Sequence, residues 1–277
     1  MPDDTMLPLP SRPISGLGPH GEFPATVEHL VVSDAAAEEA ARARYSVALV
    51  LHTMTNDWAK LQIAAIRSAL ARHNATLAQV VECSFRPERQ AEVLDGLLSQ
   101  VPDAIISVPV GLEWVADALR RIGTADIKLV LMDNVPVGMV AGRDYASVIS
   151  CDNFGNGEIA AEVLAGYIPE EGHAIVVGYN VDFHVTNERE LGFRRWFRGN
   201  RPDVTIERVQ FKHPEDAGAV VSEALLERSD VDGLFVVWDE PALLVAEAVR
   251  AAGRDIPIST VDLGGVVARD ILSLIHI

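Results

Sequence analysis

The chain has 277 residues, of which 49% are hydrophobic and 23% are charged. This length and composition suit two α/β domains of ordinary size with a sizeable core. The 40 acidic residues outnumber the 23 lysines and arginines, which gives a formal net charge of −17. Such a charge argues against a nucleic-acid-binding surface, which would have to be basic, and against docking on anionic lipid.

The first 44 residues hold six prolines and three glycines. They lack a basic start followed by an apolar block, so no ordinary signal peptide is visible. We expect residues 1–44 to form a flexible or loosely packed arm, in which only 29–44 could be helical.

From Tyr45 onward, short β-branched and leucine-rich runs alternate with longer segments of helical period. The runs predict nine strands: 47–51, 77–82, 104–108, 128–132, 147–150, 174–178, 205–211, 233–237 and 258–261. The segments between them predict helices: 58–73, 87–100, 112–122, 154–167, 186–198, 214–228 and 241–252. Asn56 or Asp57 is the expected N-cap before Trp58, and Asp239 the expected cap before Pro241.

Alternation of apolar strands with helices predicts parallel sheets covered on both faces. A Pro/Gly-rich loop and a short strand precede Cys151, and a new strand–helix series follows it. We therefore expect an α/β fold of two doubly wound parallel-sheet lobes joined by a hinge. The N-terminal lobe is predicted at 45–151 and the C-terminal lobe at 152–277.

The sequence contains none of the common catalytic motifs. The loop 52–57 after the first strand has no glycine, which argues against a dinucleotide site, and there is no Walker loop, nucleophile elbow or His-Glu-x-x-His. The histidines lack metal-ligand spacing, and Cys83 and Cys151 form no CxxC pair, so we expect both to be small buried residues. The interpretation is a protein that is not an enzyme and has neither a metal nor a cofactor.

Ligands of parallel α/β sheets bind beyond the carboxyl ends of the strands. Polar and aromatic side chains follow five of the predicted strands there. The predicted ligand-binding residues are Asn56, Trp58, Asp133, Asn134, Asn187, Trp238 and Asp262.

Those side chains share a chemical character. Aspartate and asparagine can bridge adjacent hydroxyls, and indole rings offer flat faces to the C–H face of a sugar. No arginine follows these strands, as an anionic ligand would require, so a neutral sugar or polyol is favoured. Alternatives stay open: Asp57 and Asp239 could be helix caps, the tryptophans core residues, and His52 and His184 loop residues.

Seven segments, in order, resemble those of ribose- and galactose-type solute-binding proteins of the periplasmic binding protein type I superfamily. Leu131-Met132-Asp133-Asn134 and Thr260-Val261-Asp262 resemble strands that end in a sugar-binding aspartate. Asn187 to Phe193 contains their Arg-x-x-Gly-Phe pattern. The other four segments are 47–58, 104–110, 149–155 and 237–242.

This resemblance implies two lobes that close on a sugar or polyol, a partner ABC transporter permease, a location in the cell envelope or periplasmic space, and a monomer. The alternative is the ligand-sensing domain of a lactose-repressor-type regulator or another signalling protein. Asn187 stands where many sugar binders have arginine, and Trp238 where they have asparagine, which disfavours ribose itself. Family members also continue past the last helix, so we expect a C-terminally truncated chain with an unusual ending over 270–277.

Overall fold

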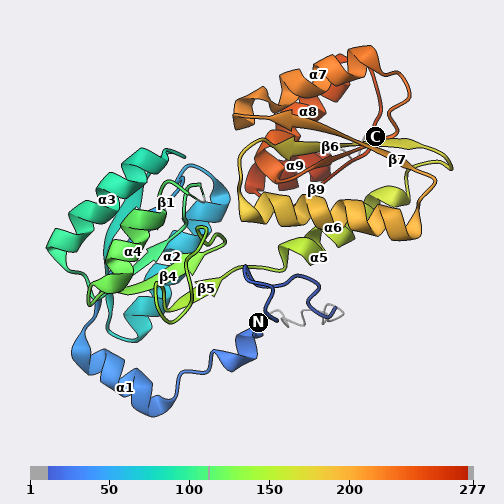
Figure 1. Ribbon diagram of the computed structural model, residues 1–277. Helices are drawn as coiled ribbons and strands as arrows, with labels where there is room; N and C mark the ends of the chain where they lie inside the picture. Colours follow the sequence, from blue (N-terminus) through green and yellow to red (C-terminus); the bar gives the residue numbers. More distant parts are fainter. Residues whose placement is uncertain (1–11, 112, 274–277) are drawn as a thin grey trace.

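The computed structural model describes residues 12–111 and 113–273, and within them the chain forms two parallel β-sheets flanked by helices (Figure 1). The first sheet has the order β2-β1-β3-β4-β5. Its strands are β1 (Ser46–Leu51), β2 (Thr76–Glu82), β3 (Ala104–Ser107), β4 (Lys128–Met132) and β5 (Ser147–Ile149). The second sheet has the order β7-β6-β8-β9, with β6 (His173–Tyr179), β7 (Thr205–Phe211), β8 (Gly233–Val236) and β9 (Ile258–Thr260).

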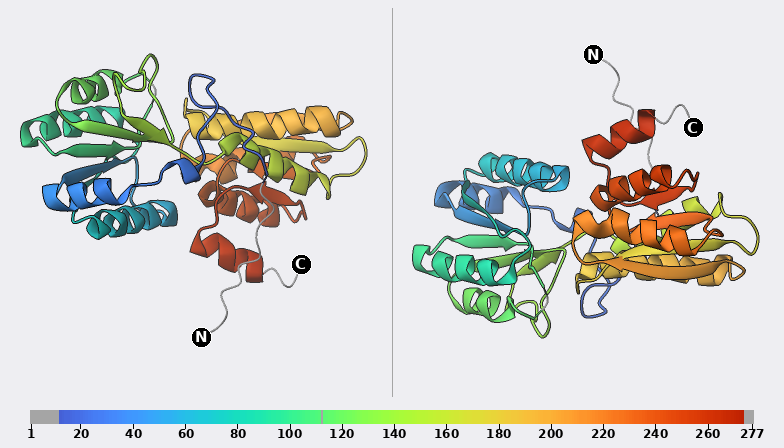
Figure 2. Two further views of the ribbon diagram at one scale, coloured as in Figure 1. Left: turned by 90° about the horizontal axis from the view of Figure 1, so that it is seen from below. Right: turned by 90° about the horizontal axis from the view of Figure 1, so that it is seen from above.

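Helices lie on both faces of each sheet, and the two sheet units sit side by side (Figure 2). The helices are α1 (Asp34–Ala43), α2 (Asp57–Arg72), α3 (Pro87–Gln100), α4 (Ala116–Thr124), α5 (Asn153–Ala165), α6 (His184–Asn200), α7 (Ala217–Glu227), α8 (Asp239–Ala251) and α9 (Gly265–Ser273). This confirms the predicted fold class of two doubly wound parallel sheets. In each sheet the strand order reverses beside the first strand of the unit, and a crevice for a ligand forms at such a point.

The central strands are apolar because they are covered on both faces. Every residue of β6 and β8 is buried, as is all of β1 except Ser46. Phe193 of α6 stacks on Phe235 of β8 at 4.4 Å between ring centroids, in the core of the second sheet unit. The predicted strands all agree with the observed ones to within one residue at each end.

Several predicted features differ from the structure, among them the start of α4, the start of α7 at Ala217 rather than at 214, and the burial of Cys151. α4 begins at Ala116 rather than at 112, because Gly111 has a left-handed backbone (φ 76°) and the residues after it form turns. Residue 112 itself lies outside the described residues. Cys83 is buried as expected, whereas Cys151 is exposed, and both are free thiols.

Helices α5 and α6 pack with their backbones close together. A Cβ atom added at Gly157 would lie 2.0 Å from the carbonyl oxygen of Arg189, and one added at Gly192 would lie 2.1 Å from that of Phe154. Both distances are far shorter than any real Cβ contact, so these two positions require glycine. The close packing fixes α6, which contributes to the crevice, against α5.

The arm contacts both sheet units. The Asn74 side chain donates to the Ala41 carbonyl of α1 at 2.8 Å. Upstream, the backbone amides of Ser15 and Gly16 donate to the Asp152 carboxylate at 2.8 and 2.9 Å, close to the start of α5 (Figure 1). No residue of α1 is buried. Residues 1–11 of the arm, and 274–277 of the ending predicted to be unusual, lie outside the described residues.

Candidate ligand-binding site

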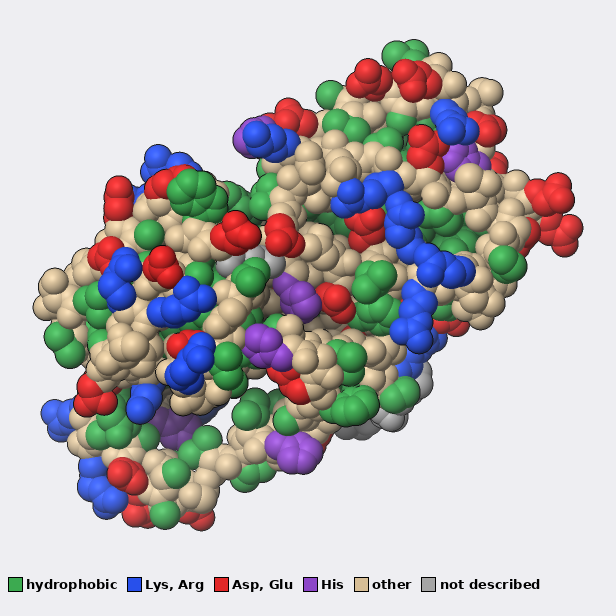
Figure 3. Space-filling model, viewed as in Figure 1, with side chains coloured by type: hydrophobic (Ala, Val, Ile, Leu, Met, Phe, Trp, Pro, Cys, Tyr) green, Lys and Arg blue, Asp and Glu red, His purple; other side chains and the backbone are tan. Residues whose placement is uncertain are grey.

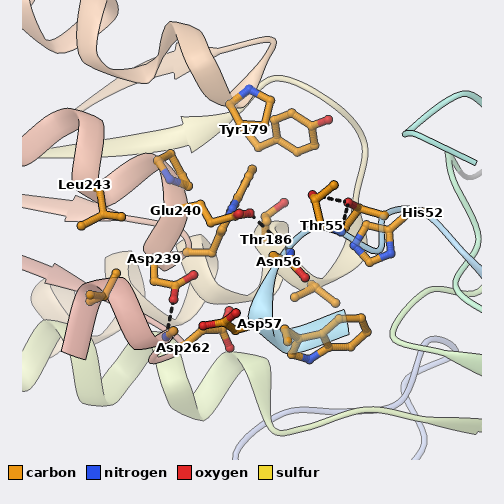
Figure 4. Close-up of a pocket in the computed structure, with 18 of the residues that line it drawn as sticks. His52, Thr55, Asn56, Asp57, Tyr179, Thr186, Asp239, Glu240, Leu243 and Asp262 are labelled. Atoms are coloured by element: carbon orange, nitrogen blue, oxygen red, sulfur yellow. Dashed lines mark hydrogen bonds between the residues drawn. The ribbon is translucent and has the colours of Figure 1, made fainter. Parts of the chain in front are cut away.

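A cleft of about 830 Å³ lies at the carboxyl ends of the two sheets and is lined by residues of both units (Figure 4). In the space-filling view the two masses of the molecule are separated by a notch with acidic side chains beside it (Figure 3). The cleft lies where the doubly wound topology predicts a ligand. Among the described residues no group of three or more His, Cys, Asp or Glu side chains could hold a metal ion.

Five of the seven predicted ligand-binding residues line this cleft. They come from the start of α2, from the ends of β4 and β9, and from the start of α8: Asn56, Trp58, Asp133, Trp238 and Asp262. Asn56 is also the N-cap of α2, because its Oδ1 accepts the Ala59 amide at 2.9 Å. This bond leaves the amide nitrogen of Asn56 free to reach Glu240 of the other unit, at 3.3 Å.

The other two predicted residues are not part of the lining. Asn134 is fully buried, and its side chain donates to the Pro109 carbonyl at 3.3 Å and accepts the His184 amide at 3.0 Å. It therefore joins the first unit to the start of α6. Asn187 is exposed, and its side chain donates to the Asp182 carboxylate at 2.9 Å.

The two aspartates at strand ends share an unusual backbone. Asp133 has φ 63° and Asp262 has φ 74°, so both are left-handed, a strained conformation for residues other than glycine and one that is common at functional sites. Ser150 Oγ donates to Asp133 at 2.8 Å. Burial raises the pKa of the Asp133 carboxyl above its usual range, with the Ser150 hydrogen bond acting in the opposite direction.

Arg189 of α6 lines the cleft and is missing from the predicted site. It is buried, and its Nη1 donates to Asp262 at 2.9 Å and to the Val237 carbonyl at 3.0 Å, while its Nε donates to Asn153 Oδ1 at 3.0 Å. The sequence does contain a signal for it. Arg189 follows Val185 by four residues and precedes Phe193 by four, which places it on the buried stripe of the helix.

A cluster of rings lines one wall of the cleft. The buried His52 ring lies 5.6 Å from Trp58, 4.9 Å from Phe85 and 5.9 Å from Phe183, measured between centroids. Burial lowers the pKa of His52 to about 4, so the imidazole is neutral at pH 7, and its Nδ1 has no hydrogen-bond partner among the described residues. Phe183 extends this cluster to Tyr179, at 6.4 Å, and Tyr179 in turn contacts Trp238 edge-on at 5.3 Å.

Two carboxylates, one from each unit, hold the start of α9, and the bond from Asp57 joins the two units. Asp57 of α2 accepts the Gly265 amide at 2.8 Å, and Asp239 accepts the Gly264 amide at 2.6 Å. The Gly265 bond, followed by Lys60, lowers the pKa of Asp57, whereas burial raises that of Asp239. Asp239 was expected to cap α8, but the side chain before α8 makes no cap bond and Asp239 binds α9 instead.

The sequence of this chain is similar to those of known binding proteins. The sequence profile of the family described as periplasmic binding protein domain matches residues 47–270. The ribose import binding protein RbsB of Bacillus subtilis is 24% identical over 179 residues. That alignment covers 64% of this chain and 56% of the relative, so it spans little more than half of the relative's length.

Solved structures of solute-binding proteins share the fold. A carbohydrate transporter solute-binding protein from Agrobacterium radiobacter, in complex with D-arabinose, has a TM-score of 0.75 at 15% identity. An ABC transporter solute-binding protein from Agrobacterium vitis, bound with α-D-tagatopyranose, has a TM-score of 0.74 at 24% identity. Each comparison covers 83% of this chain and 80% of the solved chain.

Proposed function

Because the chain belongs to the periplasmic binding protein domain family, we propose that it binds a sugar or polyol in the cleft between its two sheet units. It would serve as the solute-binding component of an ABC importer in the periplasmic space. The observation that carries the proposal is the lining of the cleft, in which two indoles accompany two left-handed aspartates at strand ends.

This lining suits a polyhydroxylated ring. Trp58 and Trp238 come from different units, and each offers an apolar face to the C–H face of a sugar. Asp133 and Asp262 supply carboxylate acceptors for hydroxyl groups, at about 1.5–3 kcal/mol for each charged hydrogen bond. We add Arg189 and His52 to the proposed site and leave out Asn134 and Asn187, since the latter two lie outside the lining.

The relatives support the class of ligand. The names of the similar proteins mention ribose import, D-arabinose and tagatopyranose, which are all monosaccharides. We extend to this chain only what these ligands share, a small ring or chain with adjacent hydroxyls. Binding would draw the two units together, so the open–closed equilibrium would contribute to affinity.

A melting-temperature screen against monosaccharides and polyols tests the proposal. A ligand that binds only the folded state stabilises it by mass action and so raises the melting temperature. At a free ligand concentration of one hundred times Kd the stabilisation is about 2.7 kcal/mol. We expect a shift with at least one compound, which is lost in Asp133→Ala and in Asp262→Ala.

Asp117→Ala is the matched control, because this α4 carboxylate is exposed and does not line the cleft. A shift that persists in both cleft variants would contradict the site. No shift with any compound on the folded protein would contradict the proposed function.

A further inference from the structure

The cleft carries an excess of negative charge. Its lining holds seven carboxylates: Asp57, Glu82, Asp133, Glu215, Asp239, Glu240 and Asp262. Two cationic side chains, Lys60 and Arg189, accompany them. A neutral ligand would not require this imbalance, and an anionic ligand would be repelled by it.

Both cationic side chains already have acidic partners. Arg189 is paired with Asp262 at 2.9 Å, and Lys60 with Asp57 at 3.4 Å. Within the described part of the chain no lysine or arginine forms an ion pair with the other five carboxylates of the lining. Unpaired carboxylates that a ligand covers are costly unless the ligand itself supplies the missing positive charge.

His52 forms part of the cleft wall and supplies no positive charge. Its side chain lines the cleft and is 9% exposed, while its Nδ1 atom is buried and has no partner among the described residues. Because burial keeps the imidazole neutral, His52 does not offset the carboxylates of the lining.

The aromatic wall favours the same kind of ligand. Trp58, Phe85 and Phe183 surround His52, and the cluster continues through Tyr179 to Trp238. The faces of such rings attract a cation that lies within about 6 Å of the ring centre. Aromatic faces and unpaired carboxylates are both features that attract an ammonium group.

We infer that the ligand of this cleft is cationic: an amino sugar or an amino polyol, whose ammonium group is held by Glu240 and the neighbouring rings. This inference rests on the proposed function of the cleft as a sugar site. Glu240 is the best placed of the carboxylates, because it is exposed at the start of α8 and its side chain binds only the Asn56 amide nitrogen among the described residues. Asp239, in contrast, is already engaged by the Gly264 amide.

Calorimetric titration with matched sets of compounds tests the charge preference. Each set has an amino, a neutral and an acidic form of one skeleton: D-glucosamine, D-glucose and D-glucuronate; D-galactosamine, D-galactose and D-galacturonate; glucamine, sorbitol and gluconate. In at least one set we expect the amino form to bind ten times more tightly than the neutral form, and the acidic form not to bind. The amino preference should fall as salt is added.

Glu240→Gln keeps the size of the side chain and its acceptor for Asn56 but removes the charge. We expect it to reduce the amino-to-neutral affinity ratio at least fivefold. Glu247→Gln, on the exposed side of the same helix and outside the lining, should leave the ratio unchanged.

The outcomes separate the two proposals. If neutral forms bind as tightly as amino forms, or acidic forms bind best, the charge inference is wrong and the sugar-binding function stands. If no compound of any set binds the folded protein, the proposed function fails and the inference fails with it.

Discussion

Replacing Gly192 by alanine should disrupt the packing of α6, the helix that carries Arg189 into the cleft. The added Cβ would lie 2.1 Å from the carbonyl oxygen of Phe154 and 3.0 Å from its carbonyl carbon. Both obstacles are backbone atoms, so no side-chain rotation relieves the clash. The two helices would have to separate by about 1 Å in a core packed to crystal-like density.

The loss of stability in Gly192→Ala can be compared with a control in the same helix. Overpacking a core costs about 1–3 kcal/mol of folding free energy. For a chain of this size, each kcal/mol lowers the melting temperature by roughly 2–4 °C. Gly199→Ala lies in the same helix, and its Cβ would meet no atom within 4 Å. Because alanine favours a helix over glycine by up to about 1 kcal/mol, this control should be neutral or slightly stabilised.

Thermal and urea unfolding of the two variants and the parent measures the difference. We expect Gly192→Ala to unfold at least 2 °C below Gly199→Ala, and to bind ligand more weakly because Arg189 moves away from Asn153. Equal stability of the two variants would refute the conclusion that α5 and α6 require glycine at their contact.

Three further predictions concern single residues. The pKa of His52 is about 4 in the folded state and 6.5 in model compounds, so the unfolded state binds more protons between these two pH values. The free energy of unfolding therefore falls as the pH is lowered through this window, by roughly 2 kcal/mol from pH 7 to pH 5. His52→Phe should lose this part of the pH dependence, and identical melting profiles of parent and variant from pH 7 to pH 5 would refute it. Asn134→Ala should lower the free energy of unfolding by about 1–3 kcal/mol, because it leaves the Pro109 carbonyl and the His184 amide unpaired. The control Asn187→Ala, at an exposed position, should change it by less than about 0.5 kcal/mol. Equal losses for the two variants in urea unfolding would contradict this prediction. Asp57→Ala removes the bond to Gly265 between the units, so small-angle scattering should show a larger radius of gyration than for Asp117→Ala; an unchanged radius would show that this bond does not hold the units together.

The secondary structure could be predicted closely because parallel strands covered on both faces are continuous apolar runs. β4 begins and ends at the predicted residues for this reason. β7 also matches its prediction, but as an edge strand in which polar and apolar residues are mixed. α9 is not among the predicted helices, since Gly264 and Gly265 at its start are typical of turns. Its first amides are instead satisfied by two distant carboxylates, of Asp57 and Asp239, and no local pattern reveals such a contact.

The cleft could be predicted in part. Strand ends of a parallel sheet converge, which is why Asp133 and Asp262 both reach the lining. The same rule selected Asn134, but adjacent residues after a strand point in different directions, and Asn134 points into the protein. Arg189 was missed because it comes from a helix face rather than from a strand end, and its orientation depends on the packing of α6 on α5.

The central claim is that a sugar or amino sugar binds between Trp58 and Trp238. Tryptophan fluorescence tests it most directly, because these two indoles line the cleft while Trp114 is exposed and Trp196 packs against the core of the second unit. Titration with the compounds that raise the melting temperature should give a saturable change in emission, which disappears in the variant that combines Trp58→Phe and Trp238→Phe. A saturable change of undiminished size in that variant would place the ligand elsewhere and contradict the account.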